Sequence, residues 1–295
     1  MIGDQAERLR LIVEDLKRFN DVAKSSRVIT VTSGKGGVGK TNISVNLAIN
    51  LAMRGFRVAL LDADFGLSNV DVILGTISRY SFVDLLKNDI GLEDILTTGP
   101  AGIKFISGGS GAKELLYIDE AQIEIIIKKM SILDEITDII IIDTGAGINH
   151  SIAKFIQASD EVILVITPEP TSLTDGYALI KSSIDVINTA KINVIFNMVS
   201  DENEAMDIER RFLITLERFL GMKVKSLGFI SRDDNVYKAV KQQQPFLMRY
   251  PQCKASKQIR VVADKLLETK GEEVYRNDYS RKGIKGFLSR LLKGA

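Results

Sequence analysis

Short apolar runs alternate with amphipathic stretches along most of the chain. The apolar runs are rich in β-branched residues and end at polar or glycine-containing turns, which predicts strands at 28–32, 58–61, 103–106, 138–142, 162–166, 193–196 and 226–229. Stretches of helical period follow them and predict helices near 41–54, 81–87, 119–131, 150–158, 172–188, 204–220, 235–243 and 255–269. Because strands that are apolar throughout are buried on both faces, we expect an α/β fold with a mostly parallel sheet flanked by helices.

The two ends of the chain fall outside this alternation. We therefore divide the chain into an N-terminal segment, 1–25, a central domain, 26–270, and a C-terminal segment, 271–295. The last of these carries a helical stripe of apolar residues opposite basic ones, and the stripe consists of Ile284, Phe287, Leu288, Leu291 and Leu292. A short basic amphipathic helix at a chain end is typical of an element that lies on an anionic membrane surface. Packing on the protein's own core or on a partner is the alternative.

Composition limits the class of protein. With 295 residues and 45% hydrophobic content, the chain can form one large α/β domain or two small ones. Its formal net charge of +1 gives no general attraction to nucleic acid, so we do not expect nucleic acid as a partner. The single cysteine, Cys253, excludes an intrachain disulfide and fits the cytoplasm. No apolar run reaches the roughly 18–20 residues of a membrane span.

One glycine-rich loop carries the most specific chemistry. Residues 33–41 read Ser-Gly-Lys-Gly-Gly-Val-Gly-Lys-Thr and match the pattern G-x-x-x-x-G-K-[ST] between a predicted strand and a predicted helix. In such a loop, backbone N–H groups and the helix N-terminus surround phosphates, the lysine reaches the β and γ oxygens, and the hydroxyl binds Mg²⁺. We predict that nucleotide contacts come from Gly34, Gly36, Gly37, Val38, Gly39, Lys40, Thr41 and Asn42.

Acidic residues follow two of the predicted strands. Asp143 ends the apolar run 139–142, while Asp62 and Asp64 follow 58–61. Because open α/β sheets bind ligands at the carboxyl ends of their strands, we predict that Thr41, Asp64 and Asp143 hold Mg²⁺. Paired acids that cap a turn are the alternative for 62–64. The tetrad Asn-Lys-x-Asp that reads guanine is absent from the sequence, which favours ATP as the nucleotide.

Lys35, a second lysine within the loop, makes the loop similar to the deviant Walker A motif of the MinD/ParA family of ATPases. The resemblance implies that Lys35 reaches the partner subunit's nucleotide in an ATP-dependent homodimer. It further implies that Asp64 positions or activates the attacking water, that Gly147 lies in a switch sensing the γ-phosphate, and that Asn197 contacts adenine. The family also includes the nitrogenase iron protein, but its bridging cluster needs two cysteines from each subunit.

The two ends resemble one branch of this family. Residues 4–10, Asp-Gln-Ala-Glu-Arg-Leu-Arg, match the DQAxxLR motif of the FlhG (FleN/YlxH) proteins, and 286–292 resemble the membrane-targeting tail of MinD. The resemblance implies an ATPase that controls flagellar number and placement, attaches peripherally to membrane when ATP is bound, and stimulates the FlhF GTPase. Flagellar basal-body components are further candidate partners. The residues expected to contact the GTPase are Asp4, Gln5, Ala6, Leu9 and Arg10.

Two other classes of function remain as alternatives. A ParA-like DNA-partition switch would use the same ATP chemistry, but it needs a basic DNA-binding face, which neither the charge balance nor the apolar tail favours. A metabolic ligase or kinase with this fold would need a pocket for an acceptor substrate. One departure from MinD is that 143–147 read Asp-Thr-Gly-Ala-Gly instead of a proline-containing switch. That difference concerns the subfamily and leaves the expected chemistry unchanged.

Overall fold

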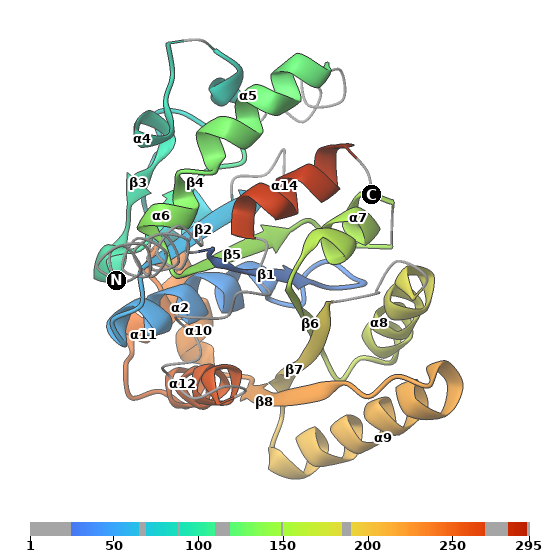
Figure 1. Ribbon diagram of the computed structural model, residues 1–295. Helices are drawn as coiled ribbons and strands as arrows, with labels where there is room; N and C mark the ends of the chain where they lie inside the picture. The colour runs from blue at the N-terminus through green and yellow to red at the C-terminus, as the bar shows by residue number, and fades with distance from the viewer. Residues whose placement is uncertain are drawn as a thin grey trace, which may run out of the picture.

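A computed structural model describes residues 25–64, 69–87, 89–109, 119–148, 150–184, 190–268 and 283–293. These residues form an eight-stranded sheet in the order β3-β4-β2-β5-β1-β6-β7-β8, with helices on both faces (Figure 1). Neighbouring strands run parallel, except that β3 pairs antiparallel with β4. The predicted α/β fold with a mostly parallel sheet is confirmed.

The strands follow the apolar runs of the sequence. Their bounds are β1 (Arg27–Thr32), β2 (Val58–Ala63), β3 (Thr97–Thr98), β4 (Lys104–Ile106), β5 (Ile139–Thr144), β6 (Glu161–Ile166), β7 (Lys191–Val199) and β8 (Lys225–Ser231). Each predicted strand is present. Only β3 was not predicted, because two residues are too few to show an alternating pattern.

The longer helices also lie where helical periodicity predicts them. They are α2 (Lys40–Met53), α5 (Glu120–Met130), α7 (His150–Ala158), α8 (Pro170–Ser183), α9 (Glu202–Leu220), α10 (Asp234–Lys241) and α12 (Lys254–Leu267). The stretch predicted at 81–87 forms the 3₁₀-helix η1 (Phe82–Leu86). Single helical turns were not predicted: α3 (Asn69–Leu74), α4 (Leu92–Ile95), α6 (Leu133–Ile136), α11 (Phe246–Arg249) and the 3₁₀ turn η2 (Pro100–Gly102).

The central strands are buried on both faces, and their side chains alternate between two cores. In β5, Ile139 and Ile141 pack in the core beneath α2 and α12, whereas Ile140 and Ile142 pack in the core beneath α5 and α7. Side chains that alternate across a strand explain why the sequence shows four consecutive isoleucines there. The sheet thus places the carboxyl ends of β1, β2 and β5 side by side, and the polar residues that follow them meet there.

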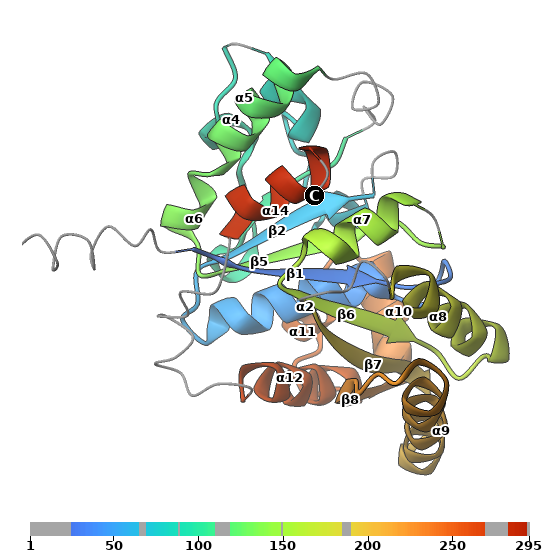
Figure 2. The same cartoon turned by 45° about the vertical axis from the view of Figure 1, so that its right-hand side comes forward.

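The C-terminal helix α14 (Gly283–Lys293) lies on the same face as α5 and α7 (Figures 1 and 2). Ile284, Phe287 and Leu288 are at most 1% exposed and belong to the core on that face. The rings of Phe287 and Phe155 in α7 lie 6.0 Å apart, and Leu291 and Leu292 are partly buried against the same core. In this structure the apolar stripe of α14 therefore completes the protein's own core.

Candidate active site

The glycine-rich loop connects the carboxyl end of β1 to the first turn of α2. Gly39 precedes α2 with a φ of 89°, a left-handed conformation that favours glycine. A Cβ atom on Gly39 would lie 2.5 Å from Nδ2 of Asn197, and one on Gly34 would lie 2.4 Å from the carbonyl oxygen of Asp175. Both positions are therefore closely packed. The loop and the N-terminus of α2 together form a site suited to an anion such as a phosphate chain.

Lys40 begins α2 and is only 8% exposed. Burial lowers the pKa of its ammonium group, while the nearby carboxylates of Asp143 and Asp64 act in the opposite direction. A buried lysine between two acids needs further negative charge to compensate for its desolvation once a cation occupies those acids. Phosphate oxygens at the loop would supply that charge.

Asp143 lies at the end of β5 and is fully buried. Its Oδ1 accepts a hydrogen bond of 2.8 Å from the hydroxyl of Ser44, and its Oδ2 is a buried oxygen without a hydrogen-bond partner. Burial raises the pKa of this carboxyl to about 6, and hydrogen bonds from Thr41 and Ser44 partly oppose the rise. A free carboxylate oxygen beside the Thr41 hydroxyl fits a Mg²⁺ ion that is held by few protein ligands and by phosphate oxygens.

Asp62 and Asp64 follow each other closely at the end of β2. Oδ1 of Asp62 accepts from the N–H of Asp64 at 3.0 Å, and its Oδ2 accepts from the N–H of Val70 at 3.2 Å. Asp64 in turn accepts a hydrogen bond of 3.2 Å from the side-chain amide of Asn69. Asp62 thus caps the backbone on both sides of 65–68, as the turn-cap alternative predicted for one of the two acids. Asp64 makes no such backbone bond among the described contacts, and its role at the site stays a prediction.

Asn197, at the end of β7, closes the other side of the loop. Its Nδ2 donates a hydrogen bond of 2.7 Å to the carbonyl of Val38, and the residue is 8% exposed. A pocket of about 520 Å³ adjoins it, and Gly39, Asn42, Tyr237 and Val240 are among the residues that line this pocket. Its size and its mixture of apolar and polar walls suit a nucleotide base.

Lys35 points away from the buried acids. Its Nζ forms an ion pair with Glu169 and a hydrogen bond of 3.1 Å with the hydroxyl of Thr171, both at the start of α8. Its side chain remains 38% exposed. The N–H of Gly147 donates to the carbonyl of Ser33 at 3.1 Å, so the segment after β5 is tied to the start of the loop.

Comparison with known proteins agrees with this geometry. The CobQ/CobB/MinD/ParA nucleotide binding domain matches residues 29–246. The chain is 39% identical to the antiactivator FleN of Pseudomonas aeruginosa over 81% of this chain and 86% of that protein. It is 34% identical to the flagellum site-determining protein YlxH of Helicobacter pylori over 99% of both chains. The septum site-determining protein MinD of Pyrococcus horikoshii, solved with Mg-ADP, has a TM-score of 0.68 at 23% identity and covers 83% of this chain and 98% of its own.

This chain belongs to the MinD/ParA family. The match spans every loop that builds the site, from the glycine-rich loop to the wall containing Asn197. As a MinD/ParA protein, the chain has a nucleotide-binding domain of the P-loop type. One of its relatives is named as a flagellum site-determining protein, in agreement with the branch that the terminal motifs predicted.

Several groups of this MinD/ParA site were not predicted from the sequence. Ser44 orients Asp143, Asn69 contacts Asp64, and Glu169 with Thr171 binds Lys35. No local pattern distinguishes Ser44 or Asn69 from other polar residues of a helix. Asp62 was visible as an acid at a strand end, but its bonds to the backbone depend on the path of the chain after β2.

Two further predicted groups belong to the two ends of the chain. Those proposed to contact a partner, Asp4 to Arg10, fall outside the described residues. The five side chains proposed to meet a membrane lie on α14, where three are fully packed in the core. No helix among the described residues is long and apolar enough to cross a membrane.

Proposed function

We propose that this MinD/ParA protein is an ATP-driven switch: it binds Mg-ATP, pairs with a second copy of itself, and separates after hydrolysis. The observation that carries the proposal is the meeting of Lys40, Asp64 and Asp143 at the glycine-rich loop, with Lys35 at the surface beside it. In this proposal Lys40 serves the nucleotide bound by its own chain. Lys35 serves the nucleotide that the second copy brings.

In the proposed reaction, water attacks the γ-phosphorus while the bond to the β-phosphate oxygen breaks, and the proton leaves on inorganic phosphate. Loop amides and Lys40 would hold the phosphate oxygens. Thr41 and Asp143 would hold Mg²⁺, and the ion would supply positive charge against the phosphates. Asp64 accepts a hydrogen bond from the attacking water and orients it. Asn69 limits the rotation of Asp64, because it already binds one of the carboxylate oxygens.

Adenine is the base that we expect in the pocket. Because Nδ2 of Asn197 donates to the carbonyl of Val38, its amide oxygen is directed elsewhere and remains available as an acceptor. An acceptor pairs with the exocyclic amine of adenine and repels the carbonyl of guanine at the same position. This arrangement supports the preference for ATP that the missing guanine tetrad indicated.

The proposed output of the switch is flagellar placement at the membrane. The relatives FleN and YlxH, an antiactivator and a flagellum site-determining protein, support the flagellar role. Membrane attachment requires α14 to leave the core, since Ile284, Phe287 and Leu288 are buried there. α7 follows the γ-phosphate-sensing segment directly and packs on α14, so it is the proposed route from nucleotide to helix. The N-terminal segment is proposed to stimulate a GTPase of the FlhF type.

Trapping the ATP-bound dimer tests the central proposal. Asp64→Ala should still bind Mg-ATP and should accumulate as a dimer, because hydrolysis is lost while phosphate contacts remain. Lys40→Ala should lose nucleotide binding, whereas Lys35→Ala should weaken the dimer more than the affinity for ATP. Light scattering reports the mass, and calorimetry reports the affinity. An Asp64→Ala protein that remains monomeric at saturating Mg-ATP would show that the switch is wrong.

A further inference from the structure

The two ends of the described fold meet on one side chain, the carboxylate of Asp134 in α6. Its Oδ1 accepts hydrogen bonds from the backbone N–H of Ser26 at 3.0 Å and of Ile284 at 2.9 Å. Its Oδ2 accepts from the N–H of Lys285 at 3.3 Å. We call these contacts of Asp134 with Ser26, Ile284 and Lys285 the Asp134 junction. Ser26 immediately precedes β1, and Ile284 lies in the first turn of α14.

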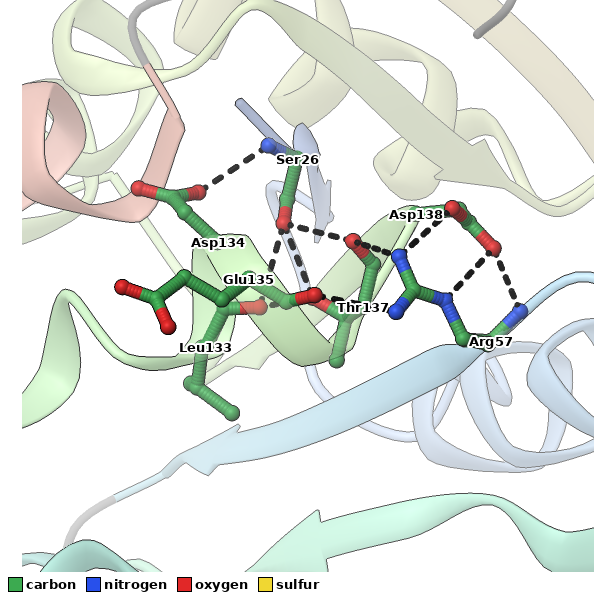
Figure 3. A network of polar contacts seen from close by, with 7 residues as sticks. All are labelled: Ser26, Arg57, Leu133, Asp134, Glu135, Thr137 and Asp138. Carbon is green, nitrogen blue, oxygen red and sulfur yellow. Dashed lines mark hydrogen bonds and ion pairs between the residues drawn. The ribbon is translucent and has the colours of Figure 1, made fainter. Parts of the chain in front are cut away.

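The β1 side of the junction is firmly held (Figure 3). The hydroxyl of Ser26 lies 2.8 Å from that of Thr137 and 3.2 Å from its carbonyl. On the other side of Thr137, the guanidinium of Arg57 donates to both oxygens of Asp138 and to the carbonyl of Glu135 at 2.9 Å. The end of α6 is thereby fixed to β1 and to the chain before β2, so a movement at Ser26 is transmitted to α6.

On the α14 side, backbone N–H groups of the first turn donate to the carboxylate of Asp134, beside the apolar packing of Ile284. The first N–H groups of a helix have no partner within the helix, and a carboxylate there also complements the helix dipole. Gly283 approaches so closely that a Cβ atom on it would lie 2.4 Å from Oδ1 of Asp134, and its φ is +61°. The first turn of α14 therefore fits against this carboxylate only in a narrow range of positions.

We propose that the Asp134 junction couples the two ends of the chain, so that displacement of the chain entering β1 weakens the docking of α14. The biological role of this coupling rests on the proposed function, in which α14 binds a membrane and the N-terminal segment binds a partner. A partner that grips the N-terminal segment and displaces Ser26 removes one of the bonds that orient Asp134. Since coupling between two sites is reciprocal, release of α14 equally loosens the entry into β1.

Hydrogen exchange in the full-length, nucleotide-free protein tests the coupling without a membrane. The readout is the exchange of backbone amides at 287–292, which bond within α14 and not to Asp134. Ser26→Pro removes the N–H that binds Asp134, and its matched control Ser26→Ala removes only the hydroxyl contacts. We expect exchange about three- to tenfold faster in Ser26→Pro than in Ser26→Ala. Asp134→Asn should accelerate exchange by roughly 10- to 100-fold, as expected for the loss of hydrogen bonds to a charged group.

The double variant decides whether the two effects share one route. If the junction couples the ends, Ser26→Pro adds almost nothing once Asp134→Asn is present, because the shared carboxylate has already been removed. Equal exchange in Ser26→Pro and Ser26→Ala, or full additivity, would overturn the proposal. Should Asp134→Asn misfold, Gly283→Ala disturbs the same contact from α14 itself and is expected to give the same acceleration. Loss of membrane binding or of ATP hydrolysis would defeat the proposed function and leave this result unaffected.

Discussion

Among the acids of the site, Asp62 has a pKa raised further than that of Asp143. Burial, reinforced by the neighbouring Asp143, raises the pKa of its carboxyl to about 7, although bonds from the N–H groups of Asp64 and Val70 act in the opposite direction. In the unfolded chain the same group has a pKa near 3.9. Between roughly pH 4 and pH 7 the folded, nucleotide-free protein therefore binds more protons than the unfolded chain does.

The sign of the resulting pH dependence follows from this difference. The free energy of unfolding should fall as pH rises from about 4 to 7, by up to about 1.4 kcal/mol per pH unit from this group, and then level off. Urea unfolding of the nucleotide-free protein at pH 5, 6, 7 and 8 measures the slope. Asp62→Asn should reduce the slope and leave the part that Asp143, whose pKa is also raised, contributes below about pH 6. The same slope in wild type and variant would show that Asp62 is ionised throughout.

At the residue scale the sequence predicted the groups that a motif places at fixed spacing and missed those that meet only in space. Lys40 and Asp143 were predicted because one belongs to a loop motif and the other ends an apolar strand. Glu169, which binds Lys35, could not be predicted, because 134 residues separate the two and no pattern connects them. Asn197 was predicted only through resemblance to the family. Its bond to Val38 needed the structure.

Among the elements, α14 shows how one pattern permits two interpretations. Its apolar stripe was predicted to meet lipid, with the protein's own core as the alternative, and the structure has the stripe in the core. Periodicity reports that one helix face avoids water but does not report which apolar phase it enters. The strands were easier to predict, because a short run of β-branched residues such as 139–142, bounded by polar turns, favours the interior of a sheet.

Arg290 joins α14 to the carboxyl end of α7 and offers a test of docking. It donates to the carbonyl of Ala158 at 3.0 Å and lies 3.8 Å from Asp160, so it satisfies the last turn of α7. Arg290→Ala should weaken docking and increase binding to anionic liposomes in the ADP state by several-fold. Lys285→Ala is the matched control, because it removes one positive charge from an exposed position on the same helix.

Liposome co-sedimentation with ADP and with ATP measures this effect. Under the proposed role, Lys285→Ala binds liposomes as wild type does or slightly more weakly, since it loses only attraction to the lipid. If both variants bound liposomes more weakly to the same degree, Arg290 would contribute to attraction to the lipid and not to the packing of α14 on α7. Truncation before residue 283 is a less informative variant, because it uncovers the core side chains that α14 covers, such as Phe155.

At the scale of the whole molecule, the N-terminal segment is predicted to act outside its own fold. A peptide of residues 1–25 should accelerate GTP hydrolysis by an FlhF-type GTPase, because a side chain supplied in trans can orient the attacking water of another nucleotide site. Gln5→Ala should lose most of the acceleration. The measurement is phosphate release by the GTPase at peptide concentrations that saturate binding. Unchanged GTP turnover at those concentrations would contradict the prediction.

Burial of the α14 stripe has a consequence for how sensitively the proposed switch can respond. The apolar side chains of the stripe, such as Phe287, are shielded from water when α14 packs on the core and also when it lies in the membrane. The change between these two states therefore transfers them from one apolar environment to another. Their transfer free energies then largely cancel, so the choice between the two locations is close to balanced. A nearly balanced choice can be reversed by a small bias, such as a few polar bonds or a second copy of the helix in a dimer. Most conservative changes in the stripe would alter both states together and leave the set point in place.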